Sequence, residues 1–423
     1  MPSERSDDAL ARLRAAEARS NPALRSSNWG AAPPDPRGMI CGGGIVRLLR
    51  RISFLLIVAS ALSACLFHHR RPRPEPAIFP VTTEWTAQIG DALEGPPARP
   101  PIATDGARVF VATVDGAVRG LDGGTGNVRW TVPDRPGTLS ARQGLLVVRE
   151  PDGTLWGMAP GSGSARWKAE THVAGALPAG LGEDAVFVGG EGLVALDAAS
   201  GRVRWTADPA PRVSAPPVAW GKWVFVPEQD GTLRCREAAT GKQVWAFSSK
   251  GALRSAPVVD EVGQRLMAGT GDRRLLALRL TDGHKRWTWK IGAEVQAVPA
   301  IFEDKVLFAT HEDVLYALKR GGGNLVWLAP LPSRPLSAPL LAQGAALVAC
   351  YGTRPKESFV VGFDARTGRR LGDLKTPSEL AAPPILVGSG LVVALRDRSI
   401  VRFGFAGPEV PDAVDKPPGG TQD

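Results

Sequence analysis

The chain has 423 residues, and its composition combines 43% hydrophobic residues with 49 glycines and 37 prolines. So many turn-forming residues, beside enough apolar residues for a core, favour an all-β protein. The formal net charge is +9, but charges of both signs are spread along the chain, apart from arginine-rich runs between residues 47 and 73. No basic stripe with interleaved aromatic residues occurs, so the composition argues against nucleic acid as a partner.

Residues 39–64 have the organisation of a bacterial lipoprotein signal peptide. Arginines precede an apolar run from Ile52 to Leu62, and a run of this length is too short for a bilayer-spanning helix, which needs roughly 20 residues. The run leads into L-S-A-C, ending at Cys65, which resembles the motif cleaved before a lipid-modified cysteine. We expect Cys65 to carry the lipid, palmitate included, and to anchor the chain. A secretory signal followed by a chance cysteine is the alternative.

The segments flanking this signal are expected to lie outside the folded part. Residues 1–38 carry no apolar run, so we expect translation to begin at Met39 and residues 1–38 to be an extension of the gene model. Residues 65–80 are rich in proline and predict an extended tether. Residues 407–423 combine proline, glycine and acidic residues and predict a disordered tail. Leu66 follows the cysteine, and by resemblance to enterobacterial lipoproteins this implies sorting to the outer membrane.

One pattern recurs along most of the remaining chain. Its clearest copy runs P-P-I-A-T-D-G-A-R-V-F-V-A-T-V-D-G-A-V-R-G-L-D-G-G-T-G-N-V-R-W and ends at Trp130. Further copies end at Trp167, Trp205, Trp245, Trp287 and Trp327, with Leu371 at the equivalent place in a seventh. The successive intervals are 37, 38, 40, 42, 40 and 44 residues. This period is that of a propeller blade.

Each copy predicts four antiparallel strands. Small residues such as those of 255–259 predict the crowded innermost strand, and the alternating residues 109–112 predict the second strand. Asp115-Gly116 predicts a type I′ hairpin, which needs positive φ at both residues. Residues 193–197 predict the third strand, which leads into an Ala-Ser-Gly or Ala-Thr-Gly turn whose glycine has positive φ. The tryptophan that ends the fourth strand is expected to be buried between blades.

The two ends of the repeat region complement each other. Residues 82–89, which contain Trp85, resemble only the last strand of a unit, whereas residues 381–405 resemble the first three. We therefore expect the first strand to pair into the last blade, which leaves no open sheet edge. The sequence predicts an all-β, eight-bladed β-propeller over residues 81–406, with four antiparallel strands in each blade.

The sequence offers little chemistry for catalysis. Cys235 and Cys350 fall in different repeats and are expected to be buried thiols and not a disulfide. The five histidines show no metal-ligand spacing, and no nucleophilic set or phosphate-binding loop stands out. We therefore expect no enzymatic activity, no bound cofactor and no metal.

The repeats resemble those of the pyrroloquinoline-quinone (PQQ) type, and a lipobox followed by one eight-bladed domain is similar to the BamB family of outer membrane protein assembly factors. The resemblance implies a non-catalytic lipoprotein of the β-barrel assembly (BAM) complex, anchored in the outer membrane and facing the periplasm. It also implies BamA and other BAM subunits as partners, together with unfolded outer membrane proteins.

The resemblance implies specific contact residues. In the family, a Leu-Arg pair before a Ser-Ala-Pro strand and acidic residues before the equivalent strand of the next blade contact BamA. Leu253 and Arg254 match the first part, and Glu294 keeps one acidic position while Gln296 replaces the other. We expect Leu253 and Arg254 to be exposed loop residues. Alternatively, they merely begin a strand and solvate its edge.

Two other functions remain open. A PQQ-dependent dehydrogenase would resemble a longer chain with an adjacent Cys-Cys pair and a Ca²⁺-binding Glu/Asn/Asp set, and no Cys-Cys occurs here. An envelope lipoprotein that binds another protein or a polysaccharide would share the same fold, because a fold does not determine its function.

Overall fold

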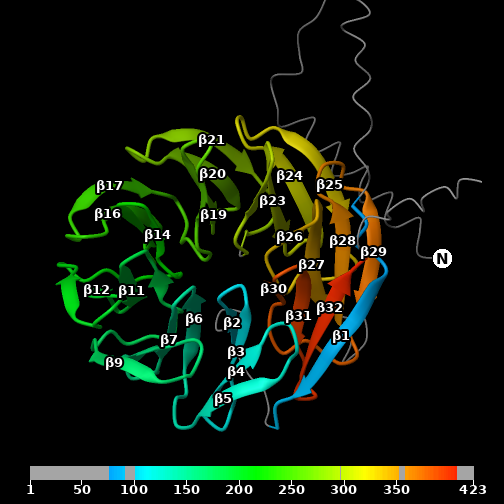
Figure 1. The fold of residues 1–423 in the computed structure, drawn as a ribbon. Helices are drawn as coiled ribbons and strands as arrows, with labels where there is room; N and C mark the ends of the chain where they lie inside the picture. The colour runs from blue at the N-terminus through cyan, green and yellow to red at the C-terminus, as the bar shows by residue number, and fades with distance from the viewer. Residues whose placement is uncertain (1–75, 91–100, 296, 352–357, 407–423) are drawn as a thin grey trace, which may run out of the picture. The chain divides into compact units, whose positions relative to one another are not determined.

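The computed structural model describes residues 76–90, 101–295, 297–351 and 358–406, which lie in the compact unit Pro74–Asp423. Within these ranges the strands form eight four-stranded sheets, and neighbouring strands in each sheet are antiparallel. The sheets follow one another around a ring (Figure 1). This arrangement confirms the eight-bladed β-propeller. No helix in the described ranges is long and apolar enough to cross a membrane.

The first four blades follow the chain order, from the innermost to the outermost strand. Blade 1 contains β2 (Ile102–Thr104), β3 (Arg108–Ala112), β4 (Val118–Asp122) and β5 (Val128–Val132). Blade 2 contains β6 (Thr138–Arg142), β7 (Leu145–Arg149), β8 (Thr154–Met158) and β9 (Ala165–Glu170). Blade 3 contains β10 (Gly180–Leu181), β11 (Ala185–Gly190), β12 (Gly192–Asp197) and β13 (Val203–Thr206). Blade 4 contains β14 (Val218–Trp220), β15 (Trp223–Pro227), β16 (Thr232–Glu237) and β17 (Gln243–Ser248).

The remaining blades continue in the same way until the last one, which recruits the first strand of the chain. Blade 5 contains β18 (Val258–Asp260), β19 (Arg265–Thr270), β20 (Arg274–Arg279) and β21 (Lys285–Lys290). Blade 6 contains β22 (Ala300–Phe302), β23 (Lys305–Thr310), β24 (Val314–Lys319) and β25 (Leu325–Pro330). Blade 7 contains β26 (Leu340–Ala342), β27 (Ala345–Tyr351), β28 (Ser358–Asp364) and β29 (Arg370–Lys375). Blade 8 contains β30 (Ile385–Val387), β31 (Gly390–Ala394), β32 (Ser399–Phe405) and β1 (Val81–Gln88).

Apolar side chains fill the space between successive blades. One cluster, for example, joins Val147, Leu155 and Trp167 of blade 2 to Val186 and Leu196 of blade 3. The second and third strands are buried on both faces, because each sheet packs against a neighbour on either side. Burying each large side chain contributes about 1.5–3 kcal/mol, so the interfaces between blades hold the ring together.

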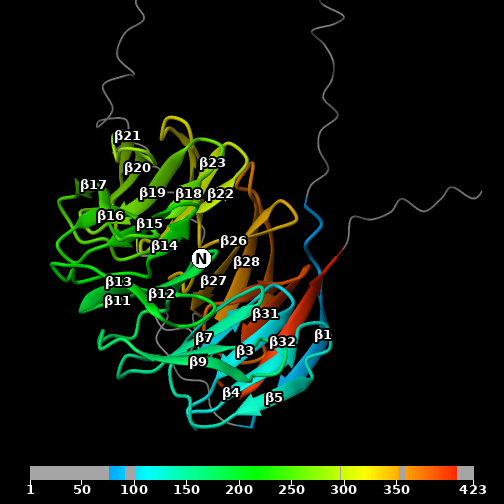
Figure 2. The same ribbon diagram turned by 60° about the vertical axis from the view of Figure 1, so that its left-hand side comes forward.

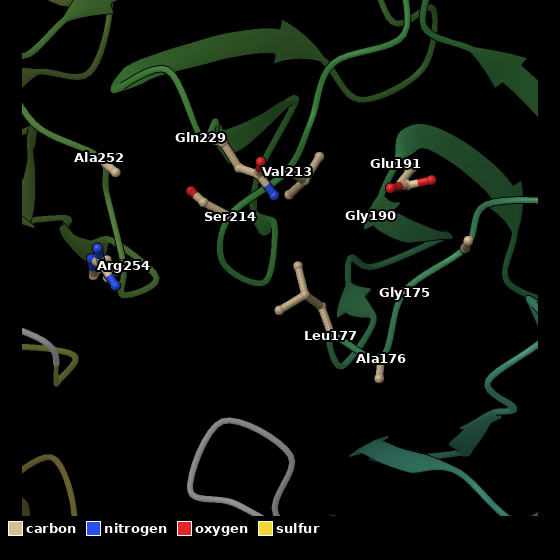
Figure 3. Close-up of a pocket in the computed structure, with 11 residues that line it drawn as sticks. Gly175, Ala176, Leu177, Gly190, Glu191, Val213, Ser214, Gln229, Ala252 and Arg254 are labelled. Carbon is tan, nitrogen blue, oxygen red and sulfur yellow. The ribbon is translucent and has the colours of Figure 1, made fainter.

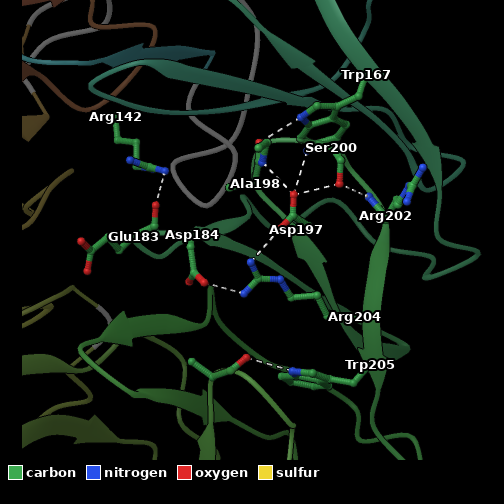
Figure 4. A network of polar contacts seen from close by, with 12 residues as sticks. Arg142, Trp167, Glu183, Asp184, Asp197, Ala198, Ser200, Arg202, Arg204 and Trp205 are labelled. Carbon is green, nitrogen blue, oxygen red and sulfur yellow. Dashed lines mark hydrogen bonds and ion pairs between the residues drawn. The ribbon is translucent and has the colours of Figure 1, made fainter.

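The tryptophan that ends each repeat locks its blade to the next one. Trp167 packs against Gly201, whose φ is +69°, in the turn between the third and fourth strands of blade 3. The indole Nε1 donates a hydrogen bond to the carbonyl of Ala198 at 3.0 Å (Figure 4). Trp205 makes the same bond to Ala238 of blade 4, at 2.9 Å. A side chain on that glycine would collide with the ring, which explains the repeated Thr-Gly and Ser-Gly turns.

The Asp-Gly hairpins differ from the expected turn type. Gly116 has a φ of +79°, but the residue before it does not have a positive φ. The N–H of Gly116 donates to the carbonyl of Thr113, and the carboxylate of Asp115 accepts from the N–H of Ala117 at 2.9 Å. The type I′ prediction was therefore wrong: this is a four-residue turn with one left-handed glycine. The aspartate side chain stabilises it by accepting a backbone hydrogen bond.

The innermost strands begin later than the sequence predicted. Residues 255–257 were expected to open the first strand of blade 5, but β18 begins at Val258. Residues 255–257 instead form the end of the connector that leads into the strand, and Pro257 is the last of them. Because a proline has no N–H to donate, the ladder begins only after it.

The ring closes as predicted. β1 pairs antiparallel with β32, from Val81 opposite Phe405 to Gln88 opposite Ser399. Figure 2 shows the two strands side by side although they come from opposite ends of the described chain. Trp85 then docks on blade 1, where its ring packs against Gly126 and its Nε1 donates to the carbonyl of Gly123.

Blade 7 departs from the tryptophan pattern, and its register corrects one assignment. Gly362 pairs with Gly372, as Gly120 pairs with Trp130 in blade 1. Gly372, and not Leu371, therefore stands at the tryptophan position. It follows the turn glycine Gly368 by four residues, as Trp130 follows Gly126.

The end of the expected tether is part of the folded unit. Ile78 is completely buried, in the cluster between blades 7 and 8. The ring of Phe79 covers Gly372. Residues 76–80 thus pack on the propeller. Cys65, the expected signal peptide 39–64 and the expected tail 407–423 lie outside the described residues.

Candidate functional site

The two faces of the propeller carry different loops. On one of them, which we call the connector face, the hairpins between second and third strands lie beside the connectors that lead from one blade to the next. The N–H of Ser249, in the connector after blade 4, donates to Gly231 in such a hairpin, and Gly271 of blade 5 donates to Ala252. The opposite face carries the turns on which the tryptophans dock.

The structure brings Arg254 and Glu294 together on the connector face. Arg254 lies in the connector between β17 and β18, and Glu294 lies in the connector between β21 and β22. Their Nε and Oε2 atoms are 3.8 Å apart, and their side chains are 60% and 36% exposed. Because both side chains are exposed, both are accessible to a partner. Such an exposed pair contributes little to stability. Gln296 lies outside the described residues.

Leu253 does not have the exposure that the sequence suggested. It is 1% exposed and packs with Phe225, Leu266 and other residues of blades 4 and 5. Its carbonyl accepts a hydrogen bond from Ser214 Oγ at 2.5 Å. The expectation of an exposed loop residue was therefore wrong, because the connector turns this apolar side chain into the core. Leu253 anchors the connector that presents Arg254.

Two cavities of about 550 Å³ each open beside Arg254. The first is lined by Leu177, Ser214, Gln229 and other residues of three successive connectors and hairpins (Figure 3). The second shares Leu177, Ser214 and Arg254 with the first and extends toward the connectors of blades 6 to 8. Arg254 thus stands where both cavities meet.

The second cavity combines apolar walls with positive charge. Alanine, proline and leucine side chains make up most of its lining, and its described lining contains Arg254 and Arg334 but no carboxylate. Ser255 lines it with a buried Oγ that has no hydrogen-bond partner within the described part of the chain. Tyr351, which is 39% exposed, contributes an aromatic ring. This chemistry suits an acidic or carbonyl-rich segment with apolar side chains.

A histidine at the same cavity remains neutral near pH 7. Burial lowers the pKa of His311, and the charge of Arg334 lowers it further. The two side chains approach to 3.5 Å between His311 Nδ1 and Arg334 Nη2. The positive charge of this wall therefore comes from arginine at neutral pH.

The sequence analysis missed His311, Arg334, Tyr351 and the buried Ser255. One signal was present: arginine precedes Ser-Ala-Pro by one to three residues in three connectors, at Arg212, Arg254 and Arg334. Because these connectors occupy equivalent places, repeated arginines there converge on one face.

A buried arginine holds one wall of the first cavity. Arg149 is 1% exposed, and its guanidinium donates to the carbonyls of Leu177, Gly189 and Val173 at 2.7–2.9 Å. These bonds tie blade 2 to the connector that carries Leu177 into both cavities. The wall is therefore rigid before any partner binds, which reduces the entropy cost of binding.

The remaining candidates for chemistry are inert or dispersed. Cys235 and Cys350 are free and buried, and burial raises the pKa of each thiol to about 12. Both are therefore protonated and unreactive at neutral pH. Among the described residues, no group of three or more His, Cys, Asp or Glu side chains could hold a metal ion.

Comparison with known proteins identifies the family. The family model described as outer membrane protein assembly factor BamB matches three overlapping ranges, residues 82–191, 151–299 and 288–410. The chain belongs to the BamB family. The BamB family protein of Burkholderia pseudomallei is 25% identical over 407 residues, which cover 83% of this chain and 95% of that protein. The BamB of Yersinia pestis is 29% identical over 145 residues.

Coverage differs among these relatives. The alignments span 37% of the Yersinia pestis protein and 36% of the one from Moranella endobia, which is 26% identical over 139 residues.

Among solved structures, BamB from Moraxella catarrhalis has a TM-score of 0.65 at 18% identity, covering 78% of this chain and 99% of that one. A europium-containing methanol dehydrogenase has a TM-score of 0.59 at 14% identity, covering 74% of this chain and 84% of that one. The fold therefore serves BamB proteins and enzymes alike.

Proposed function

We propose that this protein is a non-catalytic, lipid-anchored subunit of the β-barrel assembly machinery, which binds BamA and assists the folding of outer membrane proteins. The match of the BamB family model across residues 82–410 carries this proposal. The relatives from Yersinia pestis, Moranella endobia and Burkholderia pseudomallei are all named as outer membrane protein assembly factors.

The connector face is the proposed binding surface. Arg254 and Glu294 present charges of both signs at the mouth of apolar cavities. An apolar centre with a charged rim is typical of protein interfaces. Leu253 supports this surface from within the core.

Copurification from cells tests the partner. We expect BamA to copurify with the wild-type protein and to crosslink to a photoreactive residue at position 254. Position 286 provides the control, because Arg286 lies exposed on the outer strand β21 of blade 5, into which the connector of Arg254 leads. A set of partners that lacks BamA would contradict the proposal and would favour another envelope protein or a polysaccharide.

A charge swap separates partner contact from internal pairing. Arg254→Glu and Glu294→Arg should each weaken copurification. If Arg254 contacts BamA directly, the double variant should remain weak, although it restores an internal ion pair of opposite orientation. Full recovery in the double variant would show that the pair acts only inside the protein.

We infer that lipid on Cys65 anchors the chain in the outer membrane, facing the periplasm. The L-S-A-C motif supports this, with the charged and apolar segments before it. Cys65→Ala should abolish labelling by radioactive palmitate and release the protein from the membrane fraction. Unchanged labelling would contradict the anchor.

We infer that the protein has no dehydrogenase activity. The sequence lacks the adjacent Cys-Cys pair of PQQ-dependent enzymes. A direct test is needed because a methanol dehydrogenase has a similar fold. The protein should not reduce a dye acceptor when it is incubated with PQQ, Ca²⁺ or europium, and an alcohol. Dye reduction faster than in a control without the protein would contradict this inference.

A further inference from the structure

One residue of blade 4 breaks the pattern of the repeat. Arg236 on β16 pairs with Val224, as Leu196 pairs with Val186 in blade 3 and Leu278 with Leu266 in blade 5. The equivalent position in the other seven blades carries a large apolar side chain that is at most 4% exposed. These residues are Leu121, Met158, Leu196, Leu278, Leu318, Phe363 and Phe403. Arg236 is itself only 8% exposed, so blade 4 buries a charge where its sister blades bury hydrocarbon.

No carboxylate among the described residues forms a hydrogen bond or ion pair with this guanidinium. Arg236 Nη1 donates to the carbonyl of Gly241 at 2.9 Å, whereas Nε is buried and has no hydrogen-bond partner. Burial lowers the pKa of Arg236 and the neighbouring charge of Arg234 lowers it further, while the charge of Glu228 offsets part of this effect. Glu228 is the nearby carboxylate, but both of its oxygens accept hydrogen bonds from Arg234, at 2.7 and 2.9 Å. A buried charge without a matching partner is costly and is expected where it serves a function.

Arg236 lines a cavity of about 480 Å³ between blades 3 and 4. Lys242 lies exposed in the same lining. Ala207, Pro209 and Pro211 contribute apolar wall, and Asp208 is exposed on that side. The lining shares no residue with the two cavities beside Arg254. With Glu228 paired to Arg234, the positive groups left for a ligand are an arginine inside and a lysine at the entrance.

The geometry points to a binding site for a phosphate group on a small molecule or a lipid headgroup, with Arg236 at the inner end and Lys242 at the entrance. A guanidinium suits this ligand because its planar N–H groups can donate to two phosphate oxygens at once. The cavity is larger than one phosphate ion, and its alanine and proline wall leaves room for a compact body. A bound anion would supply the partner that Arg236 lacks.

Calorimetry on the full mature chain tests this site with inorganic phosphate and glycerol 3-phosphate as probes. We expect saturable binding that weakens at least tenfold in Arg236→Leu, which restores the residue type of the other blades. Lys242→Gln should weaken it several-fold. Arg202→Gln is the matched control, because Arg202 occupies the same turn position in blade 3 and should leave binding unchanged.

Thermal unfolding distinguishes a ligand site from a structural role for Arg236. Replacing an unmatched buried charge by leucine should leave the midpoint unchanged or raise it, while binding is lost. A lowered midpoint with unchanged phosphate binding would overturn the proposal, and so would the absence of saturable binding to both probes. Because Lys242 is exposed, Lys242→Gln should fold normally, and its effect on phosphate binding tests the site if Arg236→Leu fails to fold.

Soluble dihexanoyl phosphatidylglycerol identifies the source of the phosphate. Binding of this lipid that requires Arg236 supports a lipid headgroup. Binding of glycerol 3-phosphate alone, with the same requirement, supports a soluble phosphate compound. Binding of either one that is equal in wild type and in both variants would overturn the site.

Discussion

The ring of Phe79 covers Gly372, at the position where the six preceding blades carry a tryptophan. The phenyl Cγ lies 2.9 Å from the place that a Cβ on Gly372 would take, and the far side of the ring covers Gly362 on the neighbouring strand. In blades 1 and 2 the tryptophan ring covers the equivalent glycines, Gly120 and Gly157. Blade 7 lacks an aromatic ring of its own at this position, and the segment before β1 therefore supplies one.

Phe79→Ala should lower the free energy of unfolding by about 3 kcal/mol, because it empties a half-buried aromatic site. Gly372→Trp alone should also destabilise, since its ring would collide with Phe79. The double variant should recover part of the loss, because only one ring then occupies the site. Urea unfolding measures all three variants, and additive losses in the double variant would show that the rings do not share this space.

Trp245→Phe should cost about 1 kcal/mol more than Trp327→Phe. Both rings are buried, but Trp245 Nε1 donates to the carbonyl of Leu280 at 2.8 Å, whereas Trp327 Nε1 has no partner among the described residues. Phenylalanine removes a hydrogen bond from the first site only. Denaturant midpoints measure the difference, and equal losses would show that packing alone docks the blades.

Leu253→Ala should destabilise the protein by about 2–5 kcal/mol, because it opens a cavity between blades 4 and 5. Arg254→Ala should change stability by less than about 0.5 kcal/mol, since its side chain is exposed. Arg254→Ala should weaken partner binding because it removes a contact residue. Leu253→Ala should weaken partner binding only to the extent that it displaces the connector that carries Arg254. Thermal melts paired with copurification separate the two effects, and a stable Leu253→Ala variant would refute the buried anchor.

Acid should weaken the blade 1 hairpin through Asp115. The hydrogen bond from Arg119 and a second one from Thr113 lower the pKa of Asp115 from 3.8 to about 2. Because the folded pKa lies below the unfolded one, this stabilisation is complete above about pH 4 and is lost as the pH falls toward 2. Asp115→Asn should flatten the pH dependence of the thermal midpoint in that window. The effect is modest because Asp115 is 38% exposed, and an unchanged slope would contradict it.

The sequence was most informative wherever the repeat was exact. The tryptophan spacing and the Thr-Gly turns predicted the number of blades, because each unit must bury its faces against the next. The single strand around Trp85 and the incomplete unit at residues 381–405 predicted the closure, because each supplies what the other lacks. The one-residue error at Leu371 arose because blade 7 has no tryptophan to mark the position, although Gly372 keeps the four-residue spacing from the turn glycine Gly368.

The amino-acid sequence alone determined the all-β class, the eight blades, the closing strand and the resemblance to the BamB family. Tertiary structure alone decided that Leu253 is buried beside an exposed Arg254, that Glu294 approaches it, and that Phe79 completes blade 7. It also showed that no carboxylate among the described residues bonds to the buried Arg236. The physical reason is that the periodicity of the sequence shows which strand residues face a neighbouring blade. The pairing and burial of connector side chains depend instead on contacts between segments that are distant in the chain.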